Sequence, residues 1–243
     1  MTMIVVGSVR SSGATTLALA LAGCIGGAVL VEADPDGGVL ALRYGLAREP
    51  GLATLAASRP EAGGSVLDHA QALPGGLPVV VGPESPARAT HLLASAGARI
   101  AQVLAGSADD ITVVVDAGRL GPSSPALSLV PAANCTLVVA RPAADALVGA
   151  AERVRSIGAS ARLVLAGRGP YTADQVSAQL DCEVLATIAD DAGAARALAE
   201  GGGSKSLARS PLLRSTRSLA ALLAGRAVES SGAASAERME VRA

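Results

Sequence analysis

The sequence contains no phenylalanine and no tryptophan, and its only tyrosines are Tyr44 and Tyr171. Half of its 243 residues are nevertheless hydrophobic. A sizeable core must therefore be built from aliphatic side chains, chiefly Ala, Val and Leu. Short alternating blocks of these residues are typical of α/β folds with a buried parallel sheet.

Cysteine and lysine are also scarce. The three cysteines (Cys24, Cys135 and Cys182) form no C-x-x-C pair, which indicates buried thiols in a reducing cytoplasm and excludes a disulfide framework. Lys205 is the only lysine, and the net charge of −1 makes no electrostatic case for nucleic-acid binding. No apolar run reaches transmembrane length, and the chain does not open on a signal sequence. We therefore expect a cytoplasmic protein without membrane contact.

Strand and helix patterns alternate along the chain. Apolar β-rich runs predict strands at 28–33, 77–82, 111–116, 135–140, 162–166 and 183–188, and amphipathic spacing predicts helices at 87–105, 143–157, 173–180, 192–200 and 212–224. This alternation predicts a doubly wound, mostly parallel sheet with helices on both faces. We expect one domain over residues 1–226, and a disordered tail over 227–243 because its Ser, Ala, Glu and Arg residues bury little.

The stretch from Ile4 to Leu21, IVVGSVRSSGATTLALAL, predicts a strand, a loop of small residues and a helix. This is the layout of a phosphate-binding P-loop, in which backbone N–H groups and the helix N-terminus surround an anion. The candidate phosphate contacts are Gly7, Ser11, Ser12, Gly13, Ala14, Thr15 and Thr16. Thr15 stands where a P-loop hydroxyl would reach magnesium.

The loop departs from the usual pattern, G-x-x-x-x-G-K-[ST]. Ala14 occupies the place of the lysine, and the leading glycine, Gly7, comes one position early. A tight strand-to-helix turn that binds no ligand is therefore the alternative interpretation.

Acidic residues follow two of the expected strands. Glu32 and Asp34 end one strand, and Asp116 ends another, made of β-branched residues. Carboxyl ends of parallel strands meet at one edge of a sheet, where such folds bind ligands. We therefore expect a magnesium site formed by Thr15, Glu32 and Asp116, partly through water. A solvent-exposed strand end and a turn residue are the alternatives for Asp116 and Asp34.

With these elements in order, the chain resembles the MinD/ParA family of dimeric P-loop ATPases over nearly all of residues 3–224. The segments similar to family motifs are RSSGATT (the K-G-G-x-G-K-T-T loop), VLVEADPDGG (V-L-L-V-D-x-D-P-x-G), VVVDAG (the Walker B strand), TLVVARPAADAL (a later strand with a Pro-containing turn) and ATIADDAGAARALAEGG (I-P-x-D…A-x-x-x-G). LPVVVGPESPARA and the G-A-T-T loop are similar to the CpaE/TadZ and actinobacterial septum-site-determining branch.

The resemblance implies binding of ATP or ADP with Mg2+ and a homodimer joined at the nucleotide face. It also implies a protein partner, of unknown identity, in septum placement, chromosome partitioning or pilus and secretion assembly. By the same resemblance, Asp34 would be the catalytic acid, and Arg168, Ala189 and Asp191 would lie near the base. Some relatives carry a membrane-binding C-terminal helix, but we expect residues 212–226 to close the fold because the tail lacks apolar anchors.

Two lysines of that family are missing. The signature lysine falls at Val9 and the ordinary P-loop lysine at Ala14. Arg10 is adjacent, but its planar guanidinium is not equivalent to an ammonium group. We therefore expect a pseudo-ATPase that binds nucleotide weakly or not at all. The alternatives are a slow ATPase that uses Arg10, a ligase-like enzyme such as the dethiobiotin-synthetase group, and an interaction module without nucleotide.

Overall fold

The structure, a computed structural model, describes residues 2–58, 65–107, 111–201 and 205–240. Its strands are β1 (Met3–Ser8), β2 (Ala28–Glu32), β3 (Gln71–Ala72), β4 (Pro78–Val80), β5 (Thr112–Arg119), β6 (Cys135–Ala140), β7 (Ala161–Ala166) and β8 (Val184–Ile188). Its α-helices are α1 (Ala14–Cys24), α2 (Leu40–Tyr44), α3 (Leu52–Ala57), α4 (Pro86–Ser107), α5 (Ala144–Ile157), α6 (Ala173–Leu180), α7 (Ala192–Ala199), α8 (Lys205–Ala208) and α9 (Pro211–Glu240). Two 3-10 helices, η2 (Val66–His69) and η3 (Pro125–Ala132), complete the described elements.

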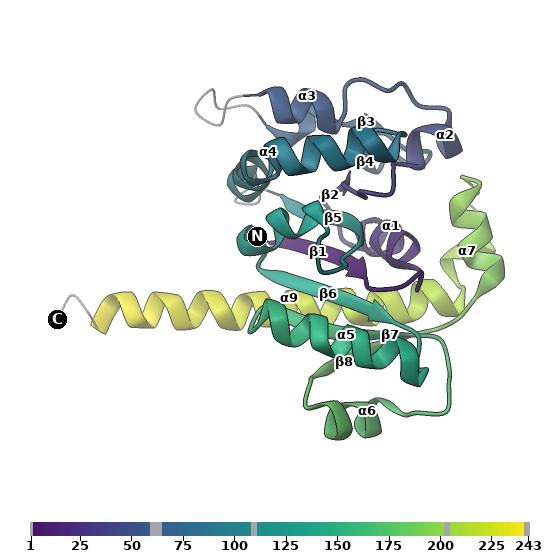
Figure 1. The fold of residues 1–243 in the computed structure, drawn as a ribbon, viewed down its shortest axis with the longest axis vertical. Coiled ribbons are helices and arrows are strands. Elements are labelled where there is room, and N and C mark those ends of the chain that lie inside the picture. The colour runs from purple at the N-terminus through teal and green to yellow at the C-terminus, as the bar shows by residue number, and fades with distance from the viewer. Residues whose placement is uncertain (1, 59–64, 108–110, 202–204, 241–243) are drawn as a thin grey trace.

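The strands form one sheet in the order β3-β4-β2-β5-β1-β6-β7-β8. All neighbouring pairs are parallel except β3 with β4. The first strand therefore lies near the middle, between β5 and β6, as Figure 1 shows. The predicted doubly wound, mostly parallel α/β fold is confirmed.

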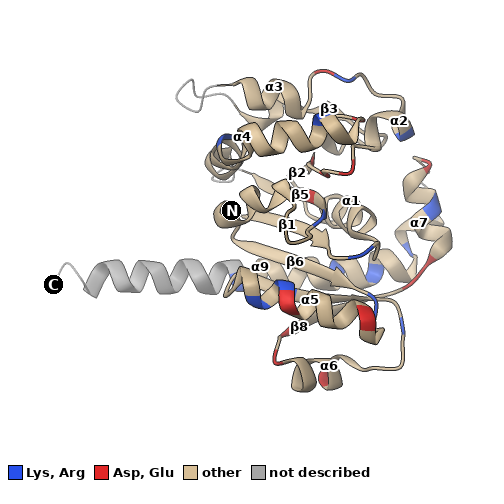
Figure 2. Cartoon of the chain, in the orientation of Figure 1, with Lys and Arg blue, Asp and Glu red and all other residues tan. Residues whose placement is uncertain are grey.

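Alternating strand residues build a separate core on each face of the sheet. Met3 and Val5 of β1 face α3, α4 and η3, whereas Ile4 and Val6 face α1, α7 and α9. A third cluster places α5 and α6 against β6 and β7. The strands carry few charges, so most of the coloured segments in Figure 2 lie on helices and loops. Buried polar groups at strand ends therefore stand out as candidates for function.

Helix α9 closes one face of the sheet, as expected for residues 212–226. Leu212, Leu219 and Leu223 are buried in the same core as α1. The helix is described as far as Glu240, and the disorder expected from residue 227 stays a prediction. Ala, Glu and Arg are good helix formers, and a helix already begun adds residues cooperatively. Residues 241–243 of the predicted tail lie outside the described part. Among the described residues, no helix combines the length and hydrophobicity needed to cross a bilayer.

Candidate functional site

The loop between β1 and α1 has the backbone geometry of an anion site. Gly13 caps α1 in the left-handed region, with φ +87°, a conformation that favours glycine. The first helical hydrogen bond joins the Leu17 N–H to the Gly13 carbonyl at 2.9 Å, and no side chain caps the helix. The N–H groups of the first turn thus have no partner within the helix. They can bind an anion at the positive end of α1.

The two positions that lack lysine face the protein interior. Ala14 is buried in the core on the α1 face, and Val9 is half-buried against the α5 cluster. Arg10 is exposed, and its Nη1 lies 3.8 Å from Oδ2 of Asp145 on α5. The loop therefore carries a single cationic side chain, which is paired with an acid outside the loop.

Asp116, on β5, is the most perturbed acid of the site. Its side chain is buried, Oδ1 accepts a hydrogen bond from the Gly118 N–H at 3.1 Å, and Oδ2 has no hydrogen-bond partner. Burial raises the pKa of Asp116 from 3.8 to about 7. The Thr15 hydroxyl and the Gly118 amide oppose this shift, and the charges of Asp34 and Glu32 add to it. A buried carboxylate oxygen without a partner, beside a hydroxyl, fits magnesium held partly through water.

Asp34 lies next to Asp116, as predicted. Its Oδ1 accepts a hydrogen bond from the Asp36 N–H at 2.8 Å, and burial raises the pKa of its carboxyl group. The side chain packs directly on Gly118, which has φ +53°. A Cβ atom at position 118 would lie 1.9 Å from Cγ of Asp34. The glycine of VVVDAG is therefore needed to admit Asp34 to the end of β5.

Both carboxylate oxygens of Glu32, a predicted magnesium ligand, accept backbone hydrogen bonds in the structure. Its Oε1 accepts hydrogen bonds from the N–H groups of Val39 (2.6 Å) and Leu40 (2.9 Å), and its Oε2 from that of Gly82 (2.9 Å). The longer side chain thus turns back to the start of α2 and to the segment after β4. Among the described residues, no group of three or more His, Cys, Asp or Glu could hold a metal ion unaided. Magnesium would therefore need oxygens from a nucleotide or from water.

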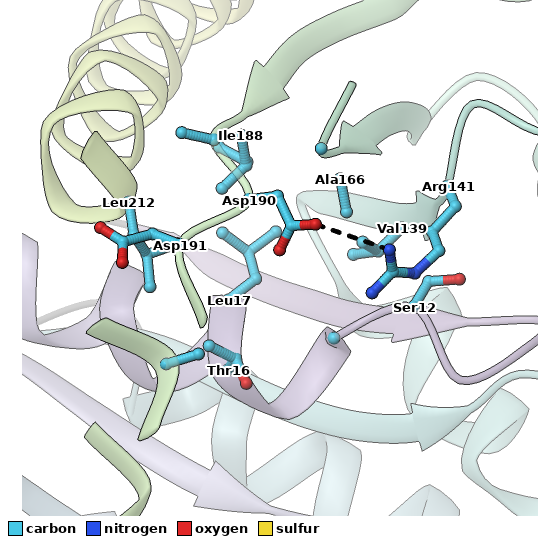
Figure 3. Close-up of a pocket in the computed structure, with 14 residues that line it drawn as sticks. Ser12, Thr16, Leu17, Val139, Arg141, Ala166, Ile188, Asp190, Asp191 and Leu212 are labelled. Atoms are coloured by element: carbon cyan, nitrogen blue, oxygen red, sulfur yellow. Dashed lines mark ion pairs between the residues drawn. The ribbon is translucent and has the colours of Figure 1, made fainter. Parts of the chain in front are cut away.

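A pocket of about 170 Å³ adjoins the loop. Ser12, Gly13 and Thr16 line one side of it, and the ends of β6, β7 and β8 line the other. Its apolar walls include Leu17, Val139 and Ile188, which Figure 3 shows on three different elements. An apolar pocket beside an anion site is suited to a nucleoside.

Several of the residues predicted to contact the nucleotide line this pocket. Ser12, Gly13, Thr16, Ala189 and Asp191 line the pocket. Oδ1 of Asp191 also accepts a hydrogen bond from the Ala194 N–H at 2.9 Å, so this carboxylate caps α7.

Three other predicted residues are placed differently. Arg168 is exposed and is not among the pocket residues. Gly7 lies within β1, where a Cβ atom would be 2.5 Å from the Leu120 side chain, so it serves close packing. Ser11 is exposed on the loop and does not line the pocket.

Sequence reasoning missed two charged residues of the pocket. Nη1 of Arg141 and Oδ2 of Asp190 face each other at 3.6 Å (Figure 3). Arg141 immediately follows β6, and Asp190 precedes the α7 cap. A charged residue directly after a buried strand is the signal that could have identified Arg141, because ligands bind at the carboxyl ends of parallel strands. Asp190 follows the end of β8 by two residues and carries a weaker form of the same signal.

Comparison with known proteins identifies the fold. No protein-family model matches the sequence, and no curated protein matches it either. Among solved structures, the cell division ATPase MinD of Pyrococcus furiosus is similar with a TM-score of 0.73 at 20% identity, covering 92% of this chain and 98% of that one. MinD of Aquifex aeolicus, in its complex with MinC, has a TM-score of 0.70 at 15% identity, with coverages of 93% and 96%.

A third similar structure is the septum site-determining protein MinD of Pyrococcus horikoshii, complexed with Mg-ADP. Its TM-score is 0.67 at 17% identity, and the match covers 90% of this chain and 93% of that one. At identities this low the structural matches show the fold alone, and that fold agrees with the eight-stranded sheet of the described residues. The chain has the fold of the MinD/ParA P-loop ATPases.

Proposed function

We propose that this protein is a cytoplasmic MinD/ParA-like positioning or regulatory factor that binds ATP or ADP with Mg2+ but hydrolyses ATP negligibly. One observation carries the proposal. The phosphate loop keeps its backbone geometry and the buried Asp116 behind it, while both lysine positions, Val9 and Ala14, are apolar and face inward. The site thus retains groups that hold a nucleotide and lacks groups that stabilise charge during phosphoryl transfer.

The missing lysines affect hydrolysis more than binding. Phosphoryl transfer is accelerated mainly by positioning and by cations that offset charge on the transferred group. Loss of one preorganised charge-stabilising donor typically lowers the rate on the order of 10²–10³-fold. Backbone N–H groups and the dipole of α1 act on the ground state as well, and neither depends on side-chain identity at positions 9 and 14.

We expect the wild-type protein to show no measurable ATP hydrolysis. Phosphate release by the wild type should not exceed that of an Asp34→Ala control. Ala14→Lys should bind Mg-ADP on the order of tenfold or more tightly, because a charged donor to phosphate contributes about 1.5–3 kcal/mol. Calorimetry measures the affinity, and a melting curve checks that the buried site accepts the longer side chain. Clear wild-type turnover that disappears in Asp34→Ala would instead indicate a slow ATPase in which another group replaces the lysines.

We further propose that the protein dimerises through its nucleotide face and recruits a protein partner. The support is the shared fold and the capture of one similar MinD in a complex with MinC. The process served would be septum placement, chromosome partitioning or pilus and secretion assembly, as in the CpaE/TadZ and septum-site-determining branch that the sequence resembles.

Dimerisation gives a separate prediction. Light scattering at high protein concentration with Mg-ATP should report twice the mass of the monomer. In such a dimer the exposed Arg10 and the loop after Asp34 would be covered. Arg10→Asp should weaken the dimer, because it replaces the partner of Asp145 by a second acid near the nucleotide. Arg99→Asp, an equal charge change on the exposed side of α4, is the matched control. A monomer under all conditions would contradict the dimer.

A further inference from the structure

We propose that Arg141 supplies the cation that the phosphate loop lacks, by donating to the phosphates of a bound nucleoside diphosphate, and that Asp190 holds its guanidinium when no nucleotide is present. This inference rests on the proposed nucleotide site and assigns one of its binding residues. It concerns binding, so it is compatible with negligible hydrolysis.

The register of the sheet brings Arg141 to the loop. β6 pairs with β1 in parallel, with Val139 opposite Ser8. The residues that follow these two positions therefore leave the sheet side by side and in the same direction. Two residues beyond Val139 is Arg141, and beyond Ser8 the phosphate loop begins. Arg141 lines the same pocket as Ser12 and Gly13, and Figure 3 shows its guanidinium directed toward Asp190 among the pocket residues.

The ion pair that holds Arg141 is a weak one. A single contact of 3.6 Å joins it to Asp190, and the side chains are 61% and 60% exposed, respectively. Exposed pairs of this kind contribute little, typically up to about 1 kcal/mol. A guanidinium carries five N–H donors in a planar fork, which matches two phosphate oxygens at once. A phosphate can therefore offer Arg141 a better partner than Asp190 does.

Two other arginines near the loop are less well placed to contact a phosphate in this pocket. Arg10 is turned toward Asp145 on α5, and Arg168 does not line the pocket. Among the residues that line the pocket, Arg141 is the only cationic side chain. The Asp190 carboxylate beside it would repel a phosphate, so the acid opposes nucleotide binding both by its charge and by retaining the guanidinium.

Calorimetry on the purified full chain with Mg-ADP and with adenosine tests the role of Arg141. Arg141→Gln should weaken Mg-ADP binding about tenfold or more, as expected for a charged donor to phosphate, and should leave adenosine binding within about twofold of the wild type. Arg99→Gln removes an exposed arginine from α4 and controls for net charge. A loss of affinity for Mg-ADP without a comparable loss for adenosine indicates a phosphate contact. Equal losses for both ligands would indicate a general disturbance of the pocket.

A double-mutant cycle tests the role of Asp190. Asp190→Asn should tighten Mg-ADP binding by up to about fivefold, and the gain should be clearly smaller when Arg141→Gln is present. Equal gains in both backgrounds would show that Asp190 acts by repulsion alone and would overturn its assignment as the holder of Arg141. If the wild type binds Mg-ADP and Arg141→Gln binds it equally, only this inference fails. If the wild type binds no Mg-ADP, the proposed function fails with it.

Discussion

Glu32→Ala should lower the free energy of unfolding by roughly 3–6 kcal/mol. The substitution removes the only acceptor that the structure shows for the N–H groups of Val39, Leu40 and Gly82, two of which lie in buried hydrogen bonds. Each buried donor left without a partner costs about 1–3 kcal/mol. The loss is large beside a typical net stability of about 5–15 kcal/mol. It should also release the start of α2 and the segment after β4, which Glu32 ties to the end of β2.

Urea denaturation followed by circular dichroism measures this loss. Glu84→Ala is the matched control, because Glu84 lies in the same region but pairs with the exposed Arg48 at 3.0 Å. That exposed pair should contribute less than about 1 kcal/mol. Glu32→Gln should fall between the two, since one amide oxygen still accepts while its NH2 group faces a backbone donor. A Glu32→Ala protein as stable as the Glu84→Ala protein would contradict the role given to Glu32.

Asp116→Asn should raise the stability of the nucleotide-free protein at pH 8 and have little effect near pH 4. The pKa of Asp116 is about 7 in the folded protein, against 3.8 for the unperturbed group. The folded state therefore binds this proton more tightly than the unfolded state, and the stability of the wild type falls as pH rises from about 4 to 7. A gap of about three pH units corresponds to roughly 4 kcal/mol, which the uncharged amide should largely recover.

Paired urea titrations of the two proteins at pH 4.5 and pH 8 isolate this contribution, because the remaining ionisable groups are common to both. Asp116→Asn should also abolish the extra stabilisation that Mg-ADP gives beyond ADP alone, since the carboxylate oxygen is lost. A variant less stable than the wild type at pH 8 would show that the buried carboxylate is already compensated in the native protein. The prediction would then be wrong.

The fold could be predicted because most of its strands and helices are encoded by residue patterns within short segments of the sequence. The runs 135–140 and 173–180 became β6 and α6 with no change of bounds, and the other predicted strands and helices agreed within a few residues apart from the end of α9. The short elements β3, α8, η2 and η3 were not predicted. Strand-to-helix alternation leaves few topologies open. The placement of Asp34, Asp116 and the loop after β1 at one edge followed from the same rule.

The side-chain contacts that the sequence did not reveal depend on partners distant in the sequence. Glu32 looked like a metal ligand because its position matched a family acid, but Gly82, 50 residues away, occupies one of its oxygens. The position of Arg141 after a buried strand can be read from the sequence, but its pairing with Asp190 cannot, because the two meet only where β6 and β8 end at the same edge. No pattern within a single segment contains such information.

The central position of β1 has a consequence for biosynthesis. Its two neighbours in the sheet, β5 and β6, begin at Thr112 and Cys135, so the first strand emerges from the ribosome more than a hundred residues before either can pair with it. During that interval both edges of an apolar strand, together with the phosphate loop that it carries, have no lasting partner. Contacts of such sequence separation form slowly and leave the nascent chain open to aggregation. A chaperone that binds extended apolar segments could bind MIVVGS during this interval.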